Sequence, residues 1–251
     1  MYFCKPILDM THKTDWFTSW FDTPFYHILY KNRNDTEAQI FMQNITSFLQ
    51  LNSNSHILDL ACGKGRHSVF LNSLGYKVTG ADLSENNINH ANTFANKNLN
   101  FVEHDMRDLF EDKYDAVFNL FTSFGYFEDE QEDIKVLKNI KNSLKENGIA
   151  VIDFLNVIEV EKNLVSQEKK LIDGIHFKIN RKIEKGFILK EIEFDFEGKK
   201  HAYFERVKYL DEEKFTLYLQ KAGLKIKHIF GGYQLSEFDK ENSKRLIFVV
   251  S

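Results

Sequence analysis

Basic residues do not outnumber acidic ones in this chain. Its 251 residues include 33 Lys and Arg against 37 Asp and Glu, and the formal net charge at pH 7 is −4. Proteins that bind the phosphate backbone of nucleic acids usually gather basic side chains into a stripe, whereas the lysines here are scattered. The composition therefore argues against a nucleic-acid partner.

Cysteine, long apolar runs and targeting signals are also scarce. Cys4 and Cys62 lie far apart and neither has a partner at zinc-ligand spacing, so we expect neither a disulfide framework nor a metal site. No run of about 18 apolar residues is present, which argues against a membrane-spanning helix and a membrane partner. The first residues lack the basic start and apolar stretch of a signal peptide. The sequence predicts a cytoplasmic protein.

What the chain does contain is a regular alternation of strand and helix patterns. From Asp35 apolar residues recur at a spacing of three to four, which predicts a helix that Asp35 or Thr36 could cap. Strands that alternate with helices imply parallel βαβ units and a doubly wound, Rossmann-like α/β fold. Strands are predicted at 56–61, 76–83, 98–105, 114–121 and 148–155, and further helices at 67–74, 84–97 and 130–145.

The pattern changes after residue 156. Residues 174–210 alternate apolar and charged side chains, with turn signals at Lys185–Gly186 and Glu197–Gly198, and this is typical of an antiparallel meander. A helix at 211–222 that ends at Gly223, and strands at 224–230 and 245–250, complete the chain. Three parts are predicted: an irregular aromatic N-terminal lid (1–34), a cofactor-binding domain (35–156 and 211–251), and an antiparallel β insertion over the acceptor site (157–210).

The most informative segment is LDLACGKGRHS at 58–68, in which a strand turns sharply into a helix. Glycines allow the backbone to approach a ligand closely. An NAD site has a third glycine and rests a pyrophosphate on the helix N-terminus, but here Ser68 takes the third position and Asp59 precedes the turn. A carboxylate at that position would repel a pyrophosphate and suits a ligand that carries an ammonium and a sulfonium.

Two further acids are predicted at strand ends. Asp82 ends the second strand, where a carboxylate can accept hydrogen bonds from ribose hydroxyls, and Asp105 ends the third, where it could accept from an adenine amino group. Taken singly, Asp82 could be a helix cap and Asp105 a turn former. The three acids together, at the carboxyl ends of parallel strands, indicate a nucleoside-binding crevice.

With these motifs the chain resembles the class I S-adenosylmethionine-dependent methyltransferases over roughly residues 35–251. The matching pieces are LDLACGKGRHS, VTGADLS, VEHDMRDL and YDAVFNLFTSFGYF, followed by a late antiparallel strand pair. The resemblance implies a seven-stranded sheet whose last strand is inserted antiparallel, an S-adenosylmethionine cofactor and a methyltransferase activity.

The resemblance also implies a set of cofactor-binding residues. It places Asp59, Ala61, Gly63 and Gly65 around the methionine moiety, Asp82 and Leu83 at the ribose and adenine, Asp105 and Met106 beside the adenine, and Asn119 or Leu120 beneath the sulfonium.

A closer resemblance is to enzymes that dimethylate the amino groups of nucleotide-linked deoxysugars, and to glycine N-methyltransferase-like enzymes. It rests on CGKGRH, DMRD, FTSFGY and FGGYQLSEFD, while the N-terminal segment does not match the sugar enzymes closely. In that segment Arg33 or Tyr30 could meet the cofactor's carboxylate. Trp16 and its aromatic neighbours could equally be a packing surface.

Methyl transfer to a small-molecule acceptor is an in-line displacement, for which the protein must align the reactants and exclude water. An amine acceptor loses a proton, which His27, Tyr126 or a backbone carbonyl could take, and Tyr30 is a further candidate catalytic residue. A hydroxyl acceptor needs a true general base. Two alternatives are an NAD-dependent oxidoreductase and a non-catalytic module that binds S-adenosylmethionine. The acceptor, the choice between N- and O-methylation and the oligomeric state, a homodimer included, stay open.

Overall fold

The computed structural model describes residues 16–31 and 35–251, and they divide into two compact units. The mixed-sheet unit contains residues 35–125, 129–162 and 210–251. The meander unit contains residues 16–31, 126–128 and 163–209. Each unit is described separately below.

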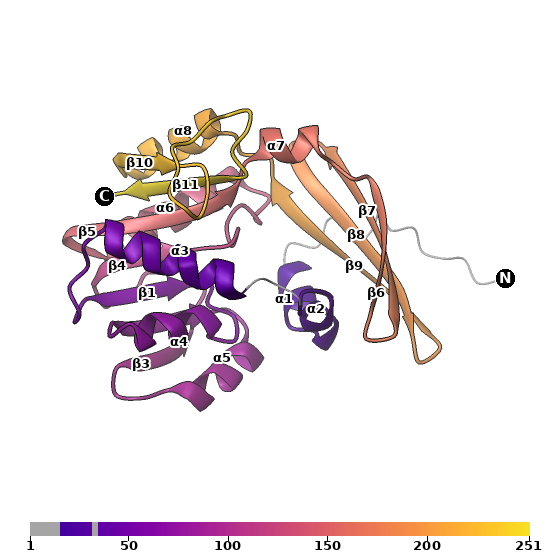
Figure 1. Ribbon diagram of the computed structural model, residues 1–251, viewed down its shortest axis with the longest axis horizontal. Coiled ribbons are helices and arrows are strands. Elements are labelled where there is room, and N and C mark those ends of the chain that lie inside the picture. The colour runs from indigo at the N-terminus through magenta and orange to yellow at the C-terminus, as the bar shows by residue number, and fades with distance from the viewer. Residues whose placement is uncertain (1–15, 32–34) are drawn as a thin grey trace. The chain divides into compact units, whose positions relative to one another are not determined.

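The mixed-sheet unit has a seven-stranded sheet (Figure 1), which confirms the predicted fold class. Its strands are β1 (His56–Leu60), β2 (Lys77–Asp82), β3 (Leu99–Glu103), β4 (Tyr114–Asn119), β5 (Leu144–Leu155), β10 (Ile226–Phe230) and β11 (Arg245–Val250). Their order is β10-β11-β5-β4-β1-β2-β3, and β1 runs parallel to both β2 and β4. β11, the last strand, is inserted antiparallel beside β5. Because β1, β2 and β3 are neighbours, their carboxyl ends meet at one edge of the sheet.

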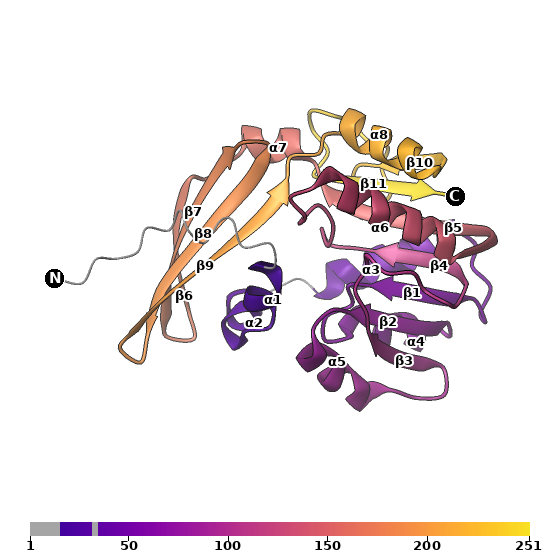
Figure 2. The ribbon, with the colours of Figure 1, turned by 180° about the vertical axis from the view of Figure 1, so that it is seen from behind.

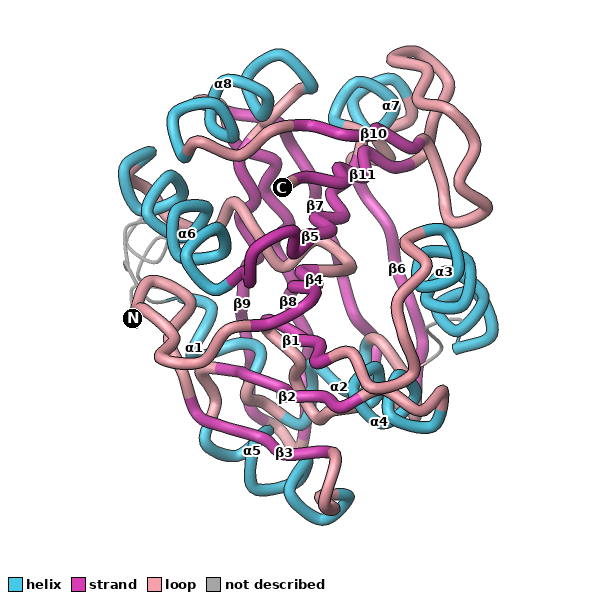
Figure 3. The backbone as a smooth tube through the Cα atoms, turned by 90° about the vertical axis from the view of Figure 1, so that its left-hand side faces the viewer, coloured by secondary structure: helices cyan, strands magenta, loops and turns pink. Residues whose placement is uncertain are grey.

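Helices cover both faces of this sheet. α6 and α8 lie on one face, and α3 and α4 lie on the other (Figure 3). Ser84 caps α5 by accepting from the backbone N–H of Asn87, and Gly223 ends α8 in the left-handed conformation, as predicted. The helices are α3 (Asp35–Phe48), α4 (Arg66–Ser73), α5 (Glu85–Ala91), α6 (Glu130–Ser143), α7 (Val157–Lys162) and α8 (Glu212–Ala222), with a short 3₁₀ helix at Asn92–Phe94.

The core of the unit lies between the sheet and these helices. Ile57 and Leu58 of β1 are fully buried, as are Phe41 of α3 and Leu71 of α4. Each buried side chain of this size contributes about 1.5–3 kcal/mol through removal of apolar surface from water. This packing holds the carboxyl ends of the strands rigidly in place.

The meander unit has a four-stranded antiparallel sheet in the order β6-β7-β8-β9 (Figure 2). Its elements are α1 (Trp16–Phe21), α2 (Pro24–Leu29), β6 (Gln167–Ile172), β7 (Ile175–Glu184), β8 (Phe187–Phe196) and β9 (Lys199–Lys208). The turns predicted at Lys185–Gly186 and Glu197–Gly198 join β7 to β8 and β8 to β9. α1 contacts β9 within this unit.

Several predicted element bounds were wrong. The N-terminal segment is not irregular, because residues 16–29 form two short helices, and β6 was not predicted. The helix expected at 84–97 ends at Ala91, since the Asn- and Thr-rich residues after it form local hydrogen bonds such as that from Thr93 Oγ1 to the carbonyl of His90. Strand β3 ends at Glu103, so Asp105 lies in the loop beyond it. No helix of the described residues is long and apolar enough to cross a bilayer.

Candidate functional site

The glycine-rich turn between β1 and α4 contains three residues at positive φ. These are Ala61 (63°), Gly63 (56°) and Gly65 (81°). A Cβ added to Gly65 would lie 2.7 Å from the ring of Phe101, so only glycine fits there without a shift of that ring. A Cβ on Gly63 would meet nothing within 4 Å. The turn is therefore packed on its Gly65 side and open above Gly63.

Three backbone N–H groups of this turn are already used within the protein. Cys62 N donates to the carbonyl of Ala81 (3.0 Å), and Gly65 N donates to the carbonyl of Cys62 (3.1 Å). Gly63 N donates to Oδ2 of Asp82 at 2.8 Å. Phosphate-binding turns instead direct their N–H groups at the ligand. These three N–H groups are therefore not available to a pyrophosphate.

Asp59 lies beneath the turn and is only 2% exposed. Burial raises the pKa of its carboxyl group to about 6; a hydrogen bond from Ser68 Oγ (2.6 Å) opposes this rise, and the negative charge of Asp82 adds to it. Ser68, in the place of a third glycine, therefore supports the acid. A cation above the turn would favour the ionised carboxylate.

Asp82, the last residue of β2, connects the turn to the start of α5. Besides accepting from Gly63, it accepts at Oδ1 from the backbone N–H of Ser84 (3.0 Å) and from Asn87 Nδ2 (3.4 Å). The neighbouring Leu83 is 37% exposed. The structure thus brings Asp82 into contact with the glycine-rich turn at the carboxyl ends of the paired strands β1 and β2.

Asp105 is held by a residue of its own loop. Both its oxygens accept from Arg107 Nε at 3.0 Å. Partial burial opposes ionisation of Asp105, but the hydrogen bonds from the Arg107 side chain and backbone outweigh it, so the pKa of Asp105 lies below its ordinary value. The carbonyl of the adjacent Met106 accepts from Asn139 Nδ2 at 3.2 Å. Contact of Asp105 or Met106 with an adenine stays a prediction.

Asn119, the last residue of β4, offers a buried acceptor beside the end of β1. Its Nδ2 donates to the carbonyls of Leu60 (3.2 Å) and Ser123 (3.5 Å). Its Oδ1 is buried and accepts no hydrogen bond from any described residue. Buried amide oxygens are nearly always hydrogen-bonded, so Oδ1 is suited to a donor or a cation from a ligand.

The candidate residues for catalysis lie in the meander unit. The hydroxyl of Tyr30 donates to Glu205 (2.6 Å to Oε1), and the indole of Trp20 donates to the same carboxylate at 2.8 Å. The ring of Tyr126 packs against Trp16 at 5.5 Å. Trp16 and Trp20 are buried, so the packing interpretation of the N-terminal aromatic residues holds for both.

Two further assignments are not tested by the structure. The ring of His27 packs against Tyr26, at 5.3 Å between ring centres. Arg33 lies outside the described residues. The catalytic role of His27 and the cofactor contact of Arg33 stay predictions.

Sequence reasoning missed a buried network in the mixed-sheet unit. Asp153 of β5 is fully buried and pairs with Arg245 of β11, with 2.7 Å between Oδ1 and Nε. The hydroxyl of Tyr233 donates to Oδ2 of Asp153 at 3.3 Å. A carboxylate within the apolar run GIAVIDFL was a usable signal, because a buried charge needs a partner.

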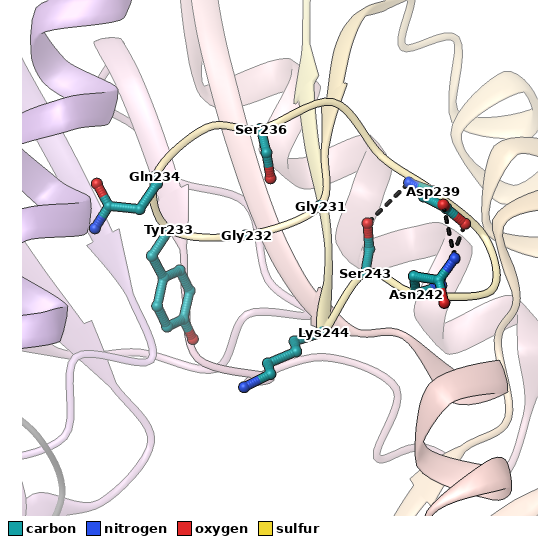
Figure 4. A pocket seen from close by; sticks show the side chains of 9 residues that line it. All are labelled: Gly231, Gly232, Tyr233, Gln234, Ser236, Asp239, Asn242, Ser243 and Lys244. Atoms are coloured by element: carbon teal, nitrogen blue, oxygen red, sulfur yellow. Dashed lines mark hydrogen bonds between the residues drawn. The ribbon is translucent and has the colours of Figure 1, made fainter.

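A pocket of about 330 Å³ lies in the loop that joins β10 to β11 (Figure 4). The loop is closed by hydrogen bonds from Asn242 Nδ2 to Asp239 Oδ2 (2.9 Å) and from Asp239 N to Ser243 Oγ (2.8 Å). None of its lining residues belongs to the glycine-rich turn. Its lining therefore includes none of the cofactor residues named above.

Part of the chain is similar in sequence to known methyltransferases. Residues 57–148 match the family model described as "Methyltransferase domain". A ubiquinone biosynthesis O-methyltransferase of Rickettsia felis is 32% identical over 127 residues, which are 49% of this chain and 50% of that protein. The chain spans about half the length, or less, of the first curated relatives it matches.

Solved structures resemble the chain over most of its length. A S-adenosylmethionine-dependent methyltransferase from Clostridium acetobutylicum has a TM-score of 0.77 at 21% identity, with 90% of this chain and 95% of that chain covered. The sugar N-methyltransferase KedS8 from Streptoalloteichus has a TM-score of 0.70 at 18% identity, with 89% and 92% covered. These similarities confirm the predicted fold.

Proposed function

We propose that this chain, which has the fold and the methyltransferase domain of the class I S-adenosylmethionine-dependent methyltransferases, binds S-adenosylmethionine and methylates a small metabolite. The cofactor supplies a methyl group that a positively charged sulfonium has already activated. The protein's own tasks are then to bind this cation, to align the acceptor and to exclude water. The acceptor atom is a nitrogen or an oxygen.

The observation that carries the proposal is the acceptor character of the glycine-rich turn. The N–H groups of Cys62, Gly63 and Gly65 are engaged within the protein. What the site offers a ligand is a buried carboxylate, Asp59, and the Oδ1 of Asn119, which accepts no hydrogen bond from the described part of the chain. Such a set favours a ligand with an ammonium and a sulfonium over a phosphate-bearing one. The residues present therefore fit the cofactor.

Each cofactor contact is part of this proposal. Asp82 would accept from the ribose hydroxyls, and Asn119 would accept from the cationic methionine moiety. The remaining assignments are Asp59, Ala61, Gly63 and Gly65 at the methionine moiety, Leu83 at the ribose and adenine, and Asp105 and Met106 at the adenine.

We propose an amino group as the acceptor. The sugar N-methyltransferase shares the fold over 89% of this chain, and the ubiquinone O-methyltransferase, which is similar in sequence over about half of it, keeps a hydroxyl acceptor as the alternative. CalS10, an amino pentose methyltransferase, covers 91% with a TM-score of 0.66. We propose residues 157–210 as the cover of the acceptor site, and Tyr126, His27 or Tyr30 as the group that takes the proton. The cytoplasmic location stays a prediction.

Binding of the cofactor tests the proposal directly. Isothermal titration of the parent protein with S-adenosylmethionine should give saturable binding, and Asp82→Asn should weaken it by about tenfold or more, since a carboxylate's hydrogen bonds are worth about 1.5–3 kcal/mol. Asp115→Asn, at the opposite end of the sheet, is the matched control and should bind like the parent. Equal affinity in Asp82→Asn and the parent would refute the ribose assignment.

A second experiment separates the alternatives. The comparisons do not favour an oxidoreductase, and a fluorescence titration with NADH should show no saturable signal. Release of S-adenosylhomocysteine should be detected with amino sugars in a screen of amine and hydroxyl metabolites. Saturable binding of S-adenosylmethionine without turnover on any acceptor would instead support a non-catalytic binding module.

A further inference from the structure

The turn that follows β4 holds two consecutive side-chain-bearing residues in the left-handed region. Phe121 has φ of 58° and Thr122 has φ of 63°. This conformation costs roughly 1–2 kcal/mol per residue for an L-amino acid, and a β-branched threonine rarely adopts it. Surrounding contacts must therefore fix the turn, and such enforced conformations cluster at functional sites.

Asp153 supplies two of these contacts from β5. Its Oδ2 accepts from the backbone N–H of Phe121 at 2.8 Å, and its backbone carbonyl accepts from the N–H of Thr122 at 3.0 Å. Both strained residues are thus hydrogen-bonded through their N–H groups to one fully buried residue. A side-chain contact and a main-chain contact from the same position fix the turn's backbone.

Arg245, the first residue of β11, completes the arrangement. Its Nε donates to Asp153 Oδ1 at 2.7 Å, and its second guanidinium nitrogen donates to Oγ1 of Thr122 at 2.8 Å. The planar guanidinium therefore donates to Asp153 and to Thr122 from two different nitrogen atoms. A lysine has a single ammonium nitrogen and cannot reproduce this geometry. The guanidinium also lies 5.6 Å from the centre of the Tyr233 ring.

The turn is also connected to the cofactor-binding segment. Asn119, just before the turn, donates from Nδ2 to the carbonyl of Leu60, the last residue of β1. On the other side, the ring of Phe121 stacks on His67 of α4, with 4.3 Å between the ring centres. The conformation at Phe121 and Thr122 is thus coupled to both ends of the glycine-rich turn.

We propose that Asp153 and Arg245 are positioning residues that hold the turn after β4 in the conformation needed to bind the sulfonium end of the cofactor. This inference rests on the proposed function. A buried ion pair is weak grounds for stability, since apolar residues of similar volume often serve a core equally well. The role that we assign to this pair is to hold the turn at Phe121 and Thr122 in a single conformation.

The sharpest test removes a single hydroxyl. Thr122→Val keeps the shape and β-branching of the side chain but loses the hydrogen bond from Arg245, while Thr122→Ser keeps the hydroxyl and is the matched control. We expect Thr122→Val to weaken S-adenosylmethionine binding by about tenfold, and to leave adenosine binding within about twofold of the parent. Adenosine lacks the sulfonium and methionine, so a general loss of structure would weaken both ligands.

Two further measurements accompany the titrations. Arg245→Lys should show the same selective loss, and Lys244→Met, which removes the exposed neighbouring cation, should not. The bound methyl resonance of ¹³C-methyl-labelled S-adenosylmethionine should shift in Thr122→Val and stay at the parent position in Thr122→Ser. Exchange of the Phe121 and Thr122 amide hydrogens should accelerate in Thr122→Val.

The outcomes separate the two proposals. If the parent binds S-adenosylmethionine and Thr122→Val binds it equally well, or if Thr122→Val and Arg245→Lys weaken adenosine and S-adenosylmethionine to the same extent, the positioning role is wrong and the proposed function stands. If the parent itself fails to bind S-adenosylmethionine, the proposed function fails, and the positioning role fails with it.

Discussion

Replacing Asp59 with asparagine should stabilise the free protein and at the same time weaken its hold on a cationic cofactor. The carboxyl group is 2% exposed and its pKa is raised to about 6, with burial as the main cause. At neutral pH the folded protein therefore carries a buried carboxylate that water would solvate better in the unfolded chain. Asparagine keeps the size and an acceptor for the Ser68 hydroxyl without the charge.

The sign of the pH dependence follows from the raised pKa. In the unfolded chain Asp59 loses its proton near 3.8, and in the folded protein near 6, so the stability that it contributes is complete below 3.8 and is lost as the pH rises to about 6. The difference between these two pKa values corresponds to a contribution of about 3 kcal/mol to the free energy of unfolding. About 2 kcal/mol of this contribution is lost between pH 4.5 and pH 7.5. The amide of the Asp59→Asn variant cannot titrate, so the variant's advantage over the parent should grow by that amount.

Urea unfolding at several pH values measures this directly. The free energy of unfolding of Asp59→Asn minus that of the parent should rise by about 2 kcal/mol from pH 4.5 to pH 7.5. Asp115→Asn is the matched control. Although partial burial opposes it, hydrogen bonds from Lys145 and from the backbone of His56 lower the pKa of Asp115, so its difference from the parent should stay nearly flat over this range. A flat difference for Asp59→Asn as well would refute the reasoning.

Two other perturbations test the packing of each unit. Gly65→Ala places a Cβ 2.7 Å from Phe101 at a φ of 81°. We therefore expect a loss of about 2–4 kcal/mol in the free energy of unfolding, measured as a lower urea midpoint. An unchanged midpoint would contradict the close packing. Glu205→Gln removes the carboxylate that pairs with Lys190, and should cost about 2–3 kcal/mol and speed amide exchange in residues 16–30. Glu193→Gln, which removes the carboxylate of a more exposed pair with Lys178, should leave that exchange unchanged.

The positions of the first five strands along the chain and the identity of the glycine-rich turn were evident in the sequence. Short apolar runs punctuated by glycine, and helices with an apolar residue every three to four positions, are local patterns, and local patterns determine element type. The parallel arrangement followed from the alternation of these elements. The N-terminal helices escaped prediction because six-residue helices rich in aromatic side chains are too short to show a recognisable period.

The contacts that shape the candidate site depended on the tertiary structure. Asp153 and Arg245 are 92 positions apart, and Tyr30 and Glu205 are 175 apart, so no local pattern connects them. The sequence also could not show that N–H groups of the turn are used within the protein, or that Oδ1 of Asn119 accepts no hydrogen bond among residues 16–31 and 35–251. The sequence by itself determined that Asp59 and Asp82 lie near the ends of their strands, because periodicity is local, but it extended the third strand as far as Asp105, whereas β3 ends at Glu103. Only the tertiary structure decided which of their polar atoms form hydrogen bonds within the protein. The partners are distant in sequence, and the pairing of the strands places them next to each other.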